Sequence, residues 1–262
     1  YWNILTYNFD GTVRNKYVDG KLIYGLLYKR TVNDVSKWDI SGDDKKDGKY
    51  IGEIENYKPN GKGALTYPDG SKFDGIWKNG LFNGNASYKF VNGDRYIGEW
   101  KNGEFHGDGS YFWFDGSKYV GGYKLGKFHG QGALTRPDGT FYEGKFKDDK
   151  FHGQGTLSRP DGRKSVGEFR NDKPWNVINF DKKGLRVQEW VNGLIKFGTI
   201  SIDGNKYLGE FKDGKFHGKG RLNFSNGNFY EGKFKDGKFH GEGTLTQSTG
   251  EKYEGEFKDG KF

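Results

Sequence analysis

The chain has 262 residues, of which 32% are hydrophobic and 18% aromatic; 45 are glycine, and the formal net charge is +8. It contains no cysteine and no run of 18 apolar residues, which excludes disulfides, cysteine-ligated zinc and a membrane-spanning helix. The aromatic content is the opposite of a disordered composition. We therefore expect a folded protein whose interior is built from rings packed on glycines.

Residues 1–49 are predicted to form degenerate repeat units with an insertion near 30–49. The stretch WNIL at residues 2–5 opens a block that parallels the block opened by WNVI at residues 175–178. The stretch from Asp43 to Gly48 superficially resembles a calcium loop, but Lys45 stands where a ligand is needed. A solvated insertion is the better interpretation of this stretch.

Regular repeats of 23 residues follow, and a fixed period of this length is typical of repeat architectures. Five of them cover residues 50–164, two degenerate repeats cover residues 165–206, and regular repeats resume over residues 207–262, ending in a half repeat. The regular repeats begin at Tyr50, Phe73, Tyr96, Tyr119, Tyr142, Tyr207, Tyr230 and Tyr253.

Each repeat has the pattern of a β-hairpin. In residues 96–100, alternation places Tyr96, Gly98 and Trp100 on one face of a strand. The turn that follows ends in Gly103, which supplies a positive φ. A second strand is expected near residues 132–135, and the sequence PDG at residues 137–139 turns the chain into the next repeat.

One such hairpin buries too little surface to be stable alone, so the hairpins must stack in a quasi-one-dimensional array. We expect each hairpin to lay its rings over the glycines of its neighbour. The predicted fold is therefore all-β, an elongated single-layer twisted sheet of tandem 23-residue β-hairpins.

These repeats resemble the MORN (membrane occupation and recognition nexus) repeat, closely over residues 50–164 and 207–262 and loosely elsewhere. The resemblance implies a hairpin-built sheet and a non-catalytic role in protein scaffolding, self-association or attachment to phospholipid surfaces. Arrays of this family also occur as accessory parts of larger enzymes. The closest match is Tyr96, Gly98, Trp100, Gly103, Gly107 and Gly109.

All five histidines occupy one context, Phe-His-Gly, at His106, His129, His152, His217 and His240. Neighbouring copies should lie about 10 Å apart, two strand spacings, which is too far for two of them to share a zinc ion. No acidic residue recurs beside them in the sequence. We interpret them as part of a structural turn, with a metal site or pH switch as the alternative, and we expect no cofactor and no enzymatic activity.

Paired lysines flank the same turn in successive repeats and are predicted to line one edge of the array, where they could hold anionic lipid headgroups. Aspartates inside these turns partly cancel the charge of the lysines, so the alternative interpretation is a solvated edge that binds no ligand. The lysines are Lys124, Lys127, Lys147, Lys150, Lys212, Lys215, Lys235, Lys238, Lys258 and Lys261.

The two ends of the chain stand at the same phase of the repeat, which suggests head-to-tail association into a filament, since open strand edges template pairing. The alternative is that the chain is cut from a longer array. The residues expected at an end-to-end contact are Trp2, Leu5, Tyr253, Phe257 and Phe262.

We thus predict a structural or scaffolding repeat protein whose partners are further copies of itself or other proteins. The alternatives are a module that binds an anionic membrane surface through the lysine edge, and an accessory region of a larger enzyme. The charge is too weakly basic to indicate specific nucleic-acid binding.

Overall fold

A computed structural model describes residues 2–32 and 35–261, which form two compact units. The N-terminal unit runs to Pro137 and takes in Phe146–Asp149; the C-terminal unit comprises Asp138–Lys145 and the residues from Lys150 onward. The regular secondary structure of the described residues is entirely β-strand. Accordingly, these residues contain no helix long and apolar enough to span a membrane.

The first twelve strands are β1 (Ile4–Tyr7), β2 (Val13–Val18), β3 (Lys21–Val32), β4 (Val35–Asp39), β5 (Gly48–Glu55), β6 (Lys58–Thr66), β7 (Lys72–Lys78), β8 (Leu81–Lys89), β9 (Arg95–Lys101), β10 (Glu104–Phe112), β11 (Lys118–Lys124) and β12 (Lys127–Thr135). The remaining strands are β13 (Phe141–Lys147), β14 (Lys150–Ser158), β15 (Lys164–Arg170), β16 (Lys173–Phe180), β17 (Arg186–Val191), β18 (Leu194–Ile202), β19 (Asn205–Lys212), β20 (Lys215–Asn223), β21 (Phe229–Lys235), β22 (Lys238–Thr246) and β23 (Lys252–Phe257).

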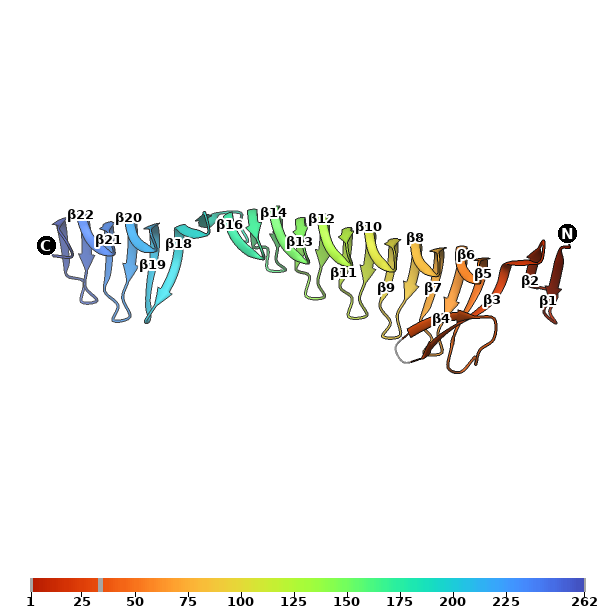
Figure 1. Ribbon diagram of the computed structural model, residues 1–262. Coiled ribbons are helices and arrows are strands. Elements are labelled where there is room, and N and C mark those ends of the chain that lie inside the picture. The colour runs from red at the N-terminus through yellow and green to blue at the C-terminus, as the bar shows by residue number, and fades with distance from the viewer. Residues whose placement is uncertain (1, 33–34, 262) are drawn as a thin grey trace. The chain divides into compact units, whose positions relative to one another are not determined.

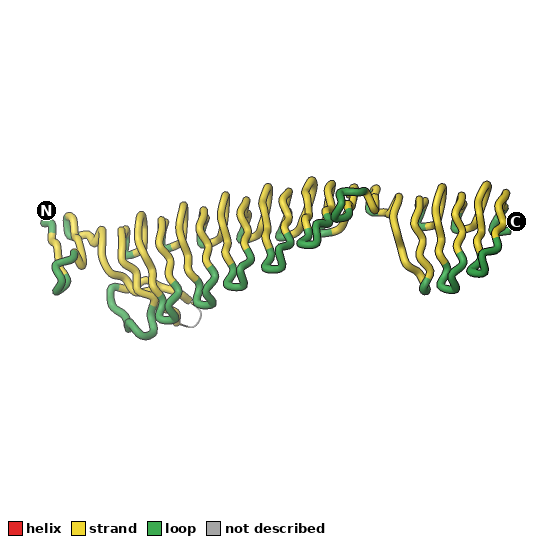
Figure 2. The backbone as a smooth tube through the Cα atoms, turned by 180° about the vertical axis from the view of Figure 1, so that it is seen from behind, coloured by secondary structure: helices red, strands yellow, loops and turns green. Residues whose placement is uncertain are grey.

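Strands that follow one another within a unit pair antiparallel in a single layer, so that each unit is a row of hairpins (Figure 1). The exception is β4, which pairs with the end of β3 while β3 itself continues to β5. In the N-terminal unit the loops that join successive hairpins lie along one edge (Figure 2). The prediction of an all-β protein built from tandem β-hairpins is confirmed.

The hairpin turns have the backbone that the sequence predicts. Asn102 and Gly103 have φ values of 52° and 86°, the two positive values of a tight hairpin turn. The loops between hairpins are closed by an aspartate, as where the Asp69 carboxylate accepts hydrogen bonds from the Ser71 amide at 2.8 Å and from the Ser71 hydroxyl at 2.6 Å.

The core of each unit is a ladder of aromatic rings on one face of the sheet. Tyr119 is fully buried and stacks on Phe128 of its own hairpin, with ring centroids 3.7 Å apart. It also meets two rings edge-on, Tyr123 of its own strand at 5.2 Å and Phe146 of the next repeat at 5.1 Å. The repeats are thus joined ring to ring as well as by strand pairing.

The glycines beneath each tyrosine belong to its own hairpin. The Tyr119 hydroxyl donates a hydrogen bond to the Gly122 carbonyl at 2.9 Å, and the ring crosses Gly121 and Gly132, which pair with each other. A Cβ added at Gly132 would lie 2.5 Å from the tyrosine oxygen. The expectation that rings cover the glycines of the neighbouring hairpin was therefore wrong.

One repeat shows what happens when the hydroxyl is absent. Phe73 takes the tyrosine position, and Ala86 takes the position of the second glycine, opposite Gly75. Since phenylalanine has no oxygen to reach the partner strand, the space above that strand accommodates a methyl group. The aromatic residue and the second glycine therefore form a matched pair.

The histidines lie in strands, which corrects their assignment to a turn. His106 lies within β10, and the register with β9 shifts between His106 and Gly109. The glycine after the histidine, Gly107, has a φ of 56°, which a β-bulge of this kind needs and which L side chains rarely adopt. The Phe-His-Gly sequence is therefore the bulge of the second strand.

The insertion near residues 30–49 folds back onto the first repeat. In that repeat Pro59 stands where the others have the stacking phenylalanine, and Trp38 of β4 packs beside it edge-on against Tyr50 at 5.8 Å and Trp77 at 5.6 Å. In the loop that follows, residues 43–46 are exposed, as expected, and the Tyr28 hydroxyl donates a 2.8 Å hydrogen bond to the exposed Asp44 carboxylate. The insertion thus supplies the ring that the first repeat lacks.

The matched pair of tyrosine and glycine predicts a thermodynamic coupling. Gly132→Ala should destabilise the protein by about 1–3 kcal/mol, because the new methyl group overpacks against the Tyr119 hydroxyl. In a Tyr119→Phe background the same substitution should cost less, by about 0.5 kcal/mol or more. Urea denaturation of the four proteins of this cycle measures the coupling, and equal costs in the two backgrounds would contradict the account.

Candidate functional site

The face of the sheet opposite the rings carries a groove in the C-terminal unit, which we call the glycine groove. It has a volume of about 620 Å³ and crosses β18 to β23. Its floor is the backbone of mid-strand glycines whose missing side chains would point to the tyrosine face; these are Gly209, Gly220, Gly232 and Gly243. The side chains that border the groove come from the residues on either side of these glycines.

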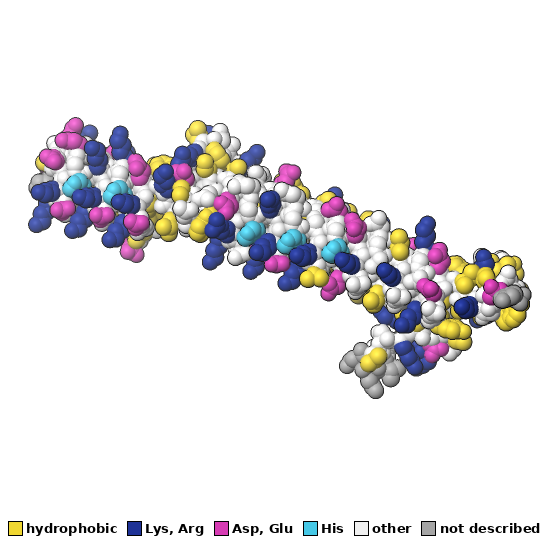
Figure 3. All heavy atoms as spheres, turned by 45° about the horizontal axis from the view of Figure 1, so that its top comes forward, with side chains coloured by type: hydrophobic (Ala, Val, Ile, Leu, Met, Phe, Trp, Pro, Cys, Tyr) yellow, Lys and Arg dark blue, Asp and Glu magenta, His cyan; other side chains and the backbone are white. Residues whose placement is uncertain are grey.

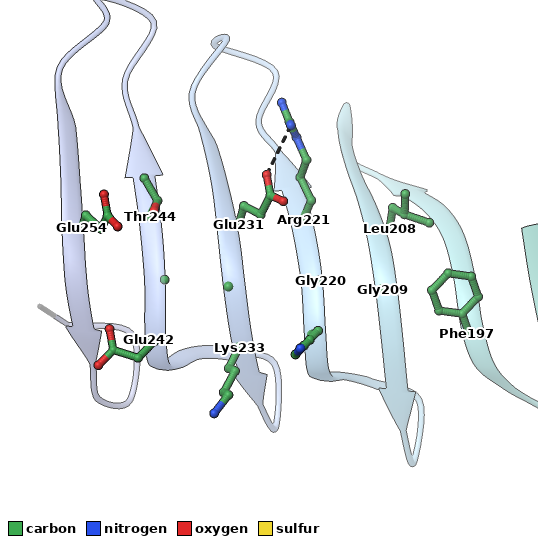
Figure 4. Close-up of a pocket in the computed structure, with 13 residues that line it drawn as sticks. Phe197, Leu208, Gly209, Gly220, Arg221, Glu231, Lys233, Glu242, Thr244 and Glu254 are labelled. Carbon is green, nitrogen blue, oxygen red and sulfur yellow. Dashed lines mark hydrogen bonds and ion pairs between the residues drawn. The ribbon is translucent and has the colours of Figure 1, made fainter.

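Two walls of side chains border this floor (Figure 4). The first wall consists of residues next to a mid-strand glycine, before it in one strand and after it in the next. They are Leu208, Arg221, Glu231, Thr244 and Glu254. The second wall, on the other side, is Lys219, Lys233 and Glu242, and Phe197 closes the end beside β19. The groove thus changes along its length from apolar at β18 and β19 to charged beyond.

The second wall carries like charges in direct register. Lys219 is paired with Lys233 across β20 and β21, and Glu242 is paired with Glu256 across β22 and β23. All four side chains are exposed. Within the described part of the chain, neither lysine forms an ion pair. Like charges directly opposite each other disfavour a strand pair, although Glu210 of β19 lies on the other side of Lys219 and accepts a 3.3 Å hydrogen bond from its amide.

In the first wall, the charge of Arg221 is instead paired with groups of the protein itself. The Arg221 guanidinium lies 3.4 Å from the Glu231 carboxylate, 3.1 Å from the Asn223 side-chain oxygen, and 4.0 Å from the centre of the Phe229 ring. Arg221 is therefore engaged within the protein, and the positive charges left for a ligand in the groove are those of Lys219 and Lys233.

The turn lysines lie where the sequence placed them. All ten are exposed, and four pairs face each other across a turn: Lys124 with Lys127, Lys212 with Lys215, Lys235 with Lys238, and Lys258 with Lys261. Lys147 and Lys150 flank the corresponding turn. These side chains lie away from the glycine groove, and phospholipid binding by them stays a prediction.

Three histidines meet an aspartate from the turn of the following repeat. Histidine Nδ1 and aspartate Oδ1 are 3.9 Å apart for His129 and Asp148, 3.9 Å apart for His217 and Asp236, and 4.0 Å apart for His240 and Asp259. Sequence neighbours alone could not reveal these contacts. Figure 3 shows the imidazoles among lysine and acidic side chains at the surface. The described residues hold no cluster of three or more metal-ligating side chains.

The residues expected at an end-to-end contact lie in unequal environments. Trp2 and Leu5 are exposed, at 57% and 47% of their full area. Phe257 is buried against Tyr230 at 5.0 Å, so it belongs to the core rather than to a surface. Tyr253 is half-buried. Phe262 lies outside the described residues.

A family model for the MORN repeat matches most of the chain in eight segments. The chain is a MORN-repeat protein. The matched segments are residues 50–72, 73–95, 96–118, 119–141, 142–162, 207–229, 230–252 and 253–262. The glycine groove lies mainly over the MORN repeats that begin at Tyr207, Tyr230 and Tyr253. A search of curated proteins found no relative of this MORN chain.

Two solved structures are similar over about three quarters of the chain. One is the TCP domain of Drosophila melanogaster SAS-4 (dCPAP) in complex with a proline-rich motif of Ana2 (dSTIL), at 12% identity and a TM-score of 0.24, covering 75% of this chain and 85% of that one. The other is the TCP10 domain of Danio rerio CPAP, at 14% identity and a TM-score of 0.27, covering 74% and 99%. At these scores the likeness does not bear on the function of the MORN chain.

The glycine groove was not predicted from the sequence, although the glycines and the charged residues that form it can be read there. The glycines were assigned to packing, and the charged residues beside them were not singled out. Only the strand register places Lys219 opposite Lys233 and Glu242 opposite Glu256. A search for like charges in the second strand of one MORN repeat and the first strand of the next would have found them.

The buried tyrosines have raised pKa values because burial disfavours the phenolate. Burial, and then the nearby Asp172 carboxylate, raises the pKa of Tyr142 to about 12. Burial is also the main cause of the raised pKa values of Tyr119 and Tyr207. The MORN tyrosines are therefore neutral hydrogen-bond donors throughout the physiological range.

A raised tyrosine pKa makes stability depend on alkaline pH. The folded state holds the Tyr142 proton more tightly than the unfolded chain, whose tyrosines titrate near 10.0. This contribution to stability is fully present below pH 10 and is lost as the pH rises toward 12. We expect the free energy of unfolding of Tyr142→Phe to fall less steeply over this range than that of the wild type. Urea denaturation followed by circular dichroism measures both slopes, and equal slopes would contradict the assignment.

Proposed function

We propose that this MORN-repeat protein is a non-catalytic association module that binds an extended segment of a partner protein in the glycine groove. The observation that supports this most directly is the groove itself, an open channel with a backbone floor and charged walls. From β19 to β23 it crosses four strand spacings, about 19 Å, which an extended chain of about six residues would fill. Its side-chain walls then supply specificity, as the walls of peptide-binding grooves do.

The composition of the groove supports a binding role rather than a catalytic one. The residues that line it include glutamates, lysines, one arginine and one threonine, but neither histidine nor cysteine. Nucleophilic catalysis by a serine, threonine or cysteine needs a base within hydrogen-bond reach of the nucleophile, and histidine is the residue that most often serves as a general acid or base. The five histidines lie at the bulges, outside the lining of the groove.

A selection experiment tests the groove as the binding surface. Peptides from a random library that bind the full chain should lose binding by tenfold or more when Thr244→Trp fills the channel. They should bind normally to Thr156→Trp, the substitution at the equivalent position of β14, which has the same half-buried environment but does not line the groove. Peptides that bind both variants equally would contradict the proposal. Binding of the chain to phosphatidylserine vesicles that is lost in high salt and in Lys215→Glu/Lys238→Glu would instead favour the lysine edge and a membrane surface.

Head-to-tail association is a second candidate, and an internal junction favours it. The N-terminal block and the block at β16 and β17 have matching contacts: the Asp19 amide donates to the Asn3 side chain at 3.2 Å, and the Asn192 amide donates to Asn176 at 2.9 Å. Within the chain, β16 pairs along its other edge with β15, a strand of the same repeat position as β23. The pairing of β15 with β16 therefore serves as a template for β23 of one copy with β1 of the next.

Sedimentation over a concentration series tests this candidate. The template predicts that the weight-average mass of the wild type rises with concentration, and that Leu5→Asp, in the exposed strand β1, abolishes the rise. Val35→Asp, at an exposed position of the insertion, should leave it unchanged. A wild type that stays monomeric at every concentration would refute end-to-end association.

A further inference from the structure

We propose that the segment recognised by the glycine groove carries an acidic and a basic residue three positions apart. An apolar residue lies two positions from the acidic one, on the side away from the basic one. This inference rests on the proposed function, because it specifies the chemistry of the partner at the same groove. In one-letter terms the pattern is Φ-x-[DE]-x-x-[KR], where Φ is apolar, or the same order reversed, since the groove does not set the direction of the bound chain.

The acidic residue follows from the lysine pair. Lys219 and Lys233 project from directly opposite positions of β20 and β21, and both are exposed. The one cation on the facing wall, Arg221, is already paired with Glu231 at 3.4 Å. A carboxylate placed between the two lysines would relieve their mutual repulsion and form two charge-assisted hydrogen bonds.

The basic residue follows from the glutamates of the next hairpin. Glu242 and Glu256 are directly opposite each other in β22 and β23, and Glu254 stands on the facing wall, opposite Thr244. Glu242 and Glu254 line this end of the channel from its two walls, and Glu256, directly opposite Glu242, adds a third carboxylate beside it. A single ammonium or guanidinium group would neutralise this part of the groove.

The apolar residue follows from the other end of the channel. Phe197 is half-buried and Leu208 is 43% exposed, and both line the groove next to β19. Figure 4 shows their side chains at the same end of the channel, apart from the charged ones. An apolar side chain seated there would remove this exposed hydrocarbon from water.

The spacing follows from the geometry of the two chains. The midpoints of the lysine pair and the glutamate pair are two strand spacings apart, about 9.6 Å, which equals about three residues of extended chain. Leu208 on β19 is one and a half spacings from the lysine pair, about 7 Å, or about two residues.

The charge order is particular to the C-terminal unit. At the equivalent positions of the N-terminal unit, the directly opposed residues are Lys62 with Ile76, Asn85 with Glu99, and Asp108 with Gly122. None of these pairs joins like charges. The N-terminal unit therefore offers the same glycine backbone without the alternating charges.

Two parallel selections from one random peptide library test the pattern, with the wild-type chain and the charge-inverted variant Lys219→Glu/Lys233→Glu as baits. Peptides selected on the wild type, and shown by Thr244→Trp to bind in the groove, should share the acid and the base three positions apart. They should bind the charge-inverted variant at least tenfold more weakly. Peptides selected on that variant should carry a basic residue at the position of the acid.

A matched control separates the groove from general electrostatics. The variant Lys215→Glu/Lys238→Glu makes the same change in net charge at turn positions outside the groove, and it should alter the affinity of the wild-type-selected peptides less than twofold. Equal losses of peptide affinity in the two double variants would overturn the inference. Groove-bound peptides with no acid–base pattern would also overturn it but would leave the proposed function standing. A selection that yields no groove-bound peptide would overturn both. Circular dichroism of each variant confirms that it is folded.

Discussion

The structure depends on one interaction, a tyrosine ring laid across two paired glycines of its own hairpin. The ring needs both glycines because any Cβ there would meet the ring, the phenolic oxygen or the backbone of the partner strand. The hydroxyl in turn donates a hydrogen bond to a carbonyl beside the bulge, as from Tyr207 to Glu210 at 2.9 Å. The stacking phenylalanine and the ring of the next repeat then bury the tyrosine completely. Each repeat is thus closed on one face by its own aromatic residues and joined to its neighbour through them.

The same interaction explains why the opposite face can serve as a binding surface. With rings on only one side, the sheet has no second layer, and on the open face the backbone of the glycines lies between two rows of side chains. In the C-terminal unit they carry opposed lysines followed by opposed glutamates. Like charges in direct register repel each other, and a partner segment with an acidic and a basic residue would relieve this repulsion.

The sequence was sufficient for the repeat, the hairpins and their turns, because these follow from local spacing and from residues such as Asn102 and Gly103 whose backbone preferences are strong. It was insufficient wherever two distant segments meet. The sequence does not show that Trp38 of the insertion supplies the ring missing at Pro59. The histidines were taken as part of a turn because a β-bulge and a turn both need glycine after them. The groove was not predicted because only the strand register shows which of its charged residues lie directly opposite each other.

The central claim is that the glycine-lined face, and not the turn edge, receives the partner. Lysine footprinting by acetylation, read by mass spectrometry with and without a bound partner peptide, tests it directly, because both surfaces carry exposed lysines. The account predicts that Lys219 and Lys233 become protected while Lys215 and Lys238 stay reactive. Protection of the turn lysines, with Lys219 and Lys233 still freely acetylated, would contradict it.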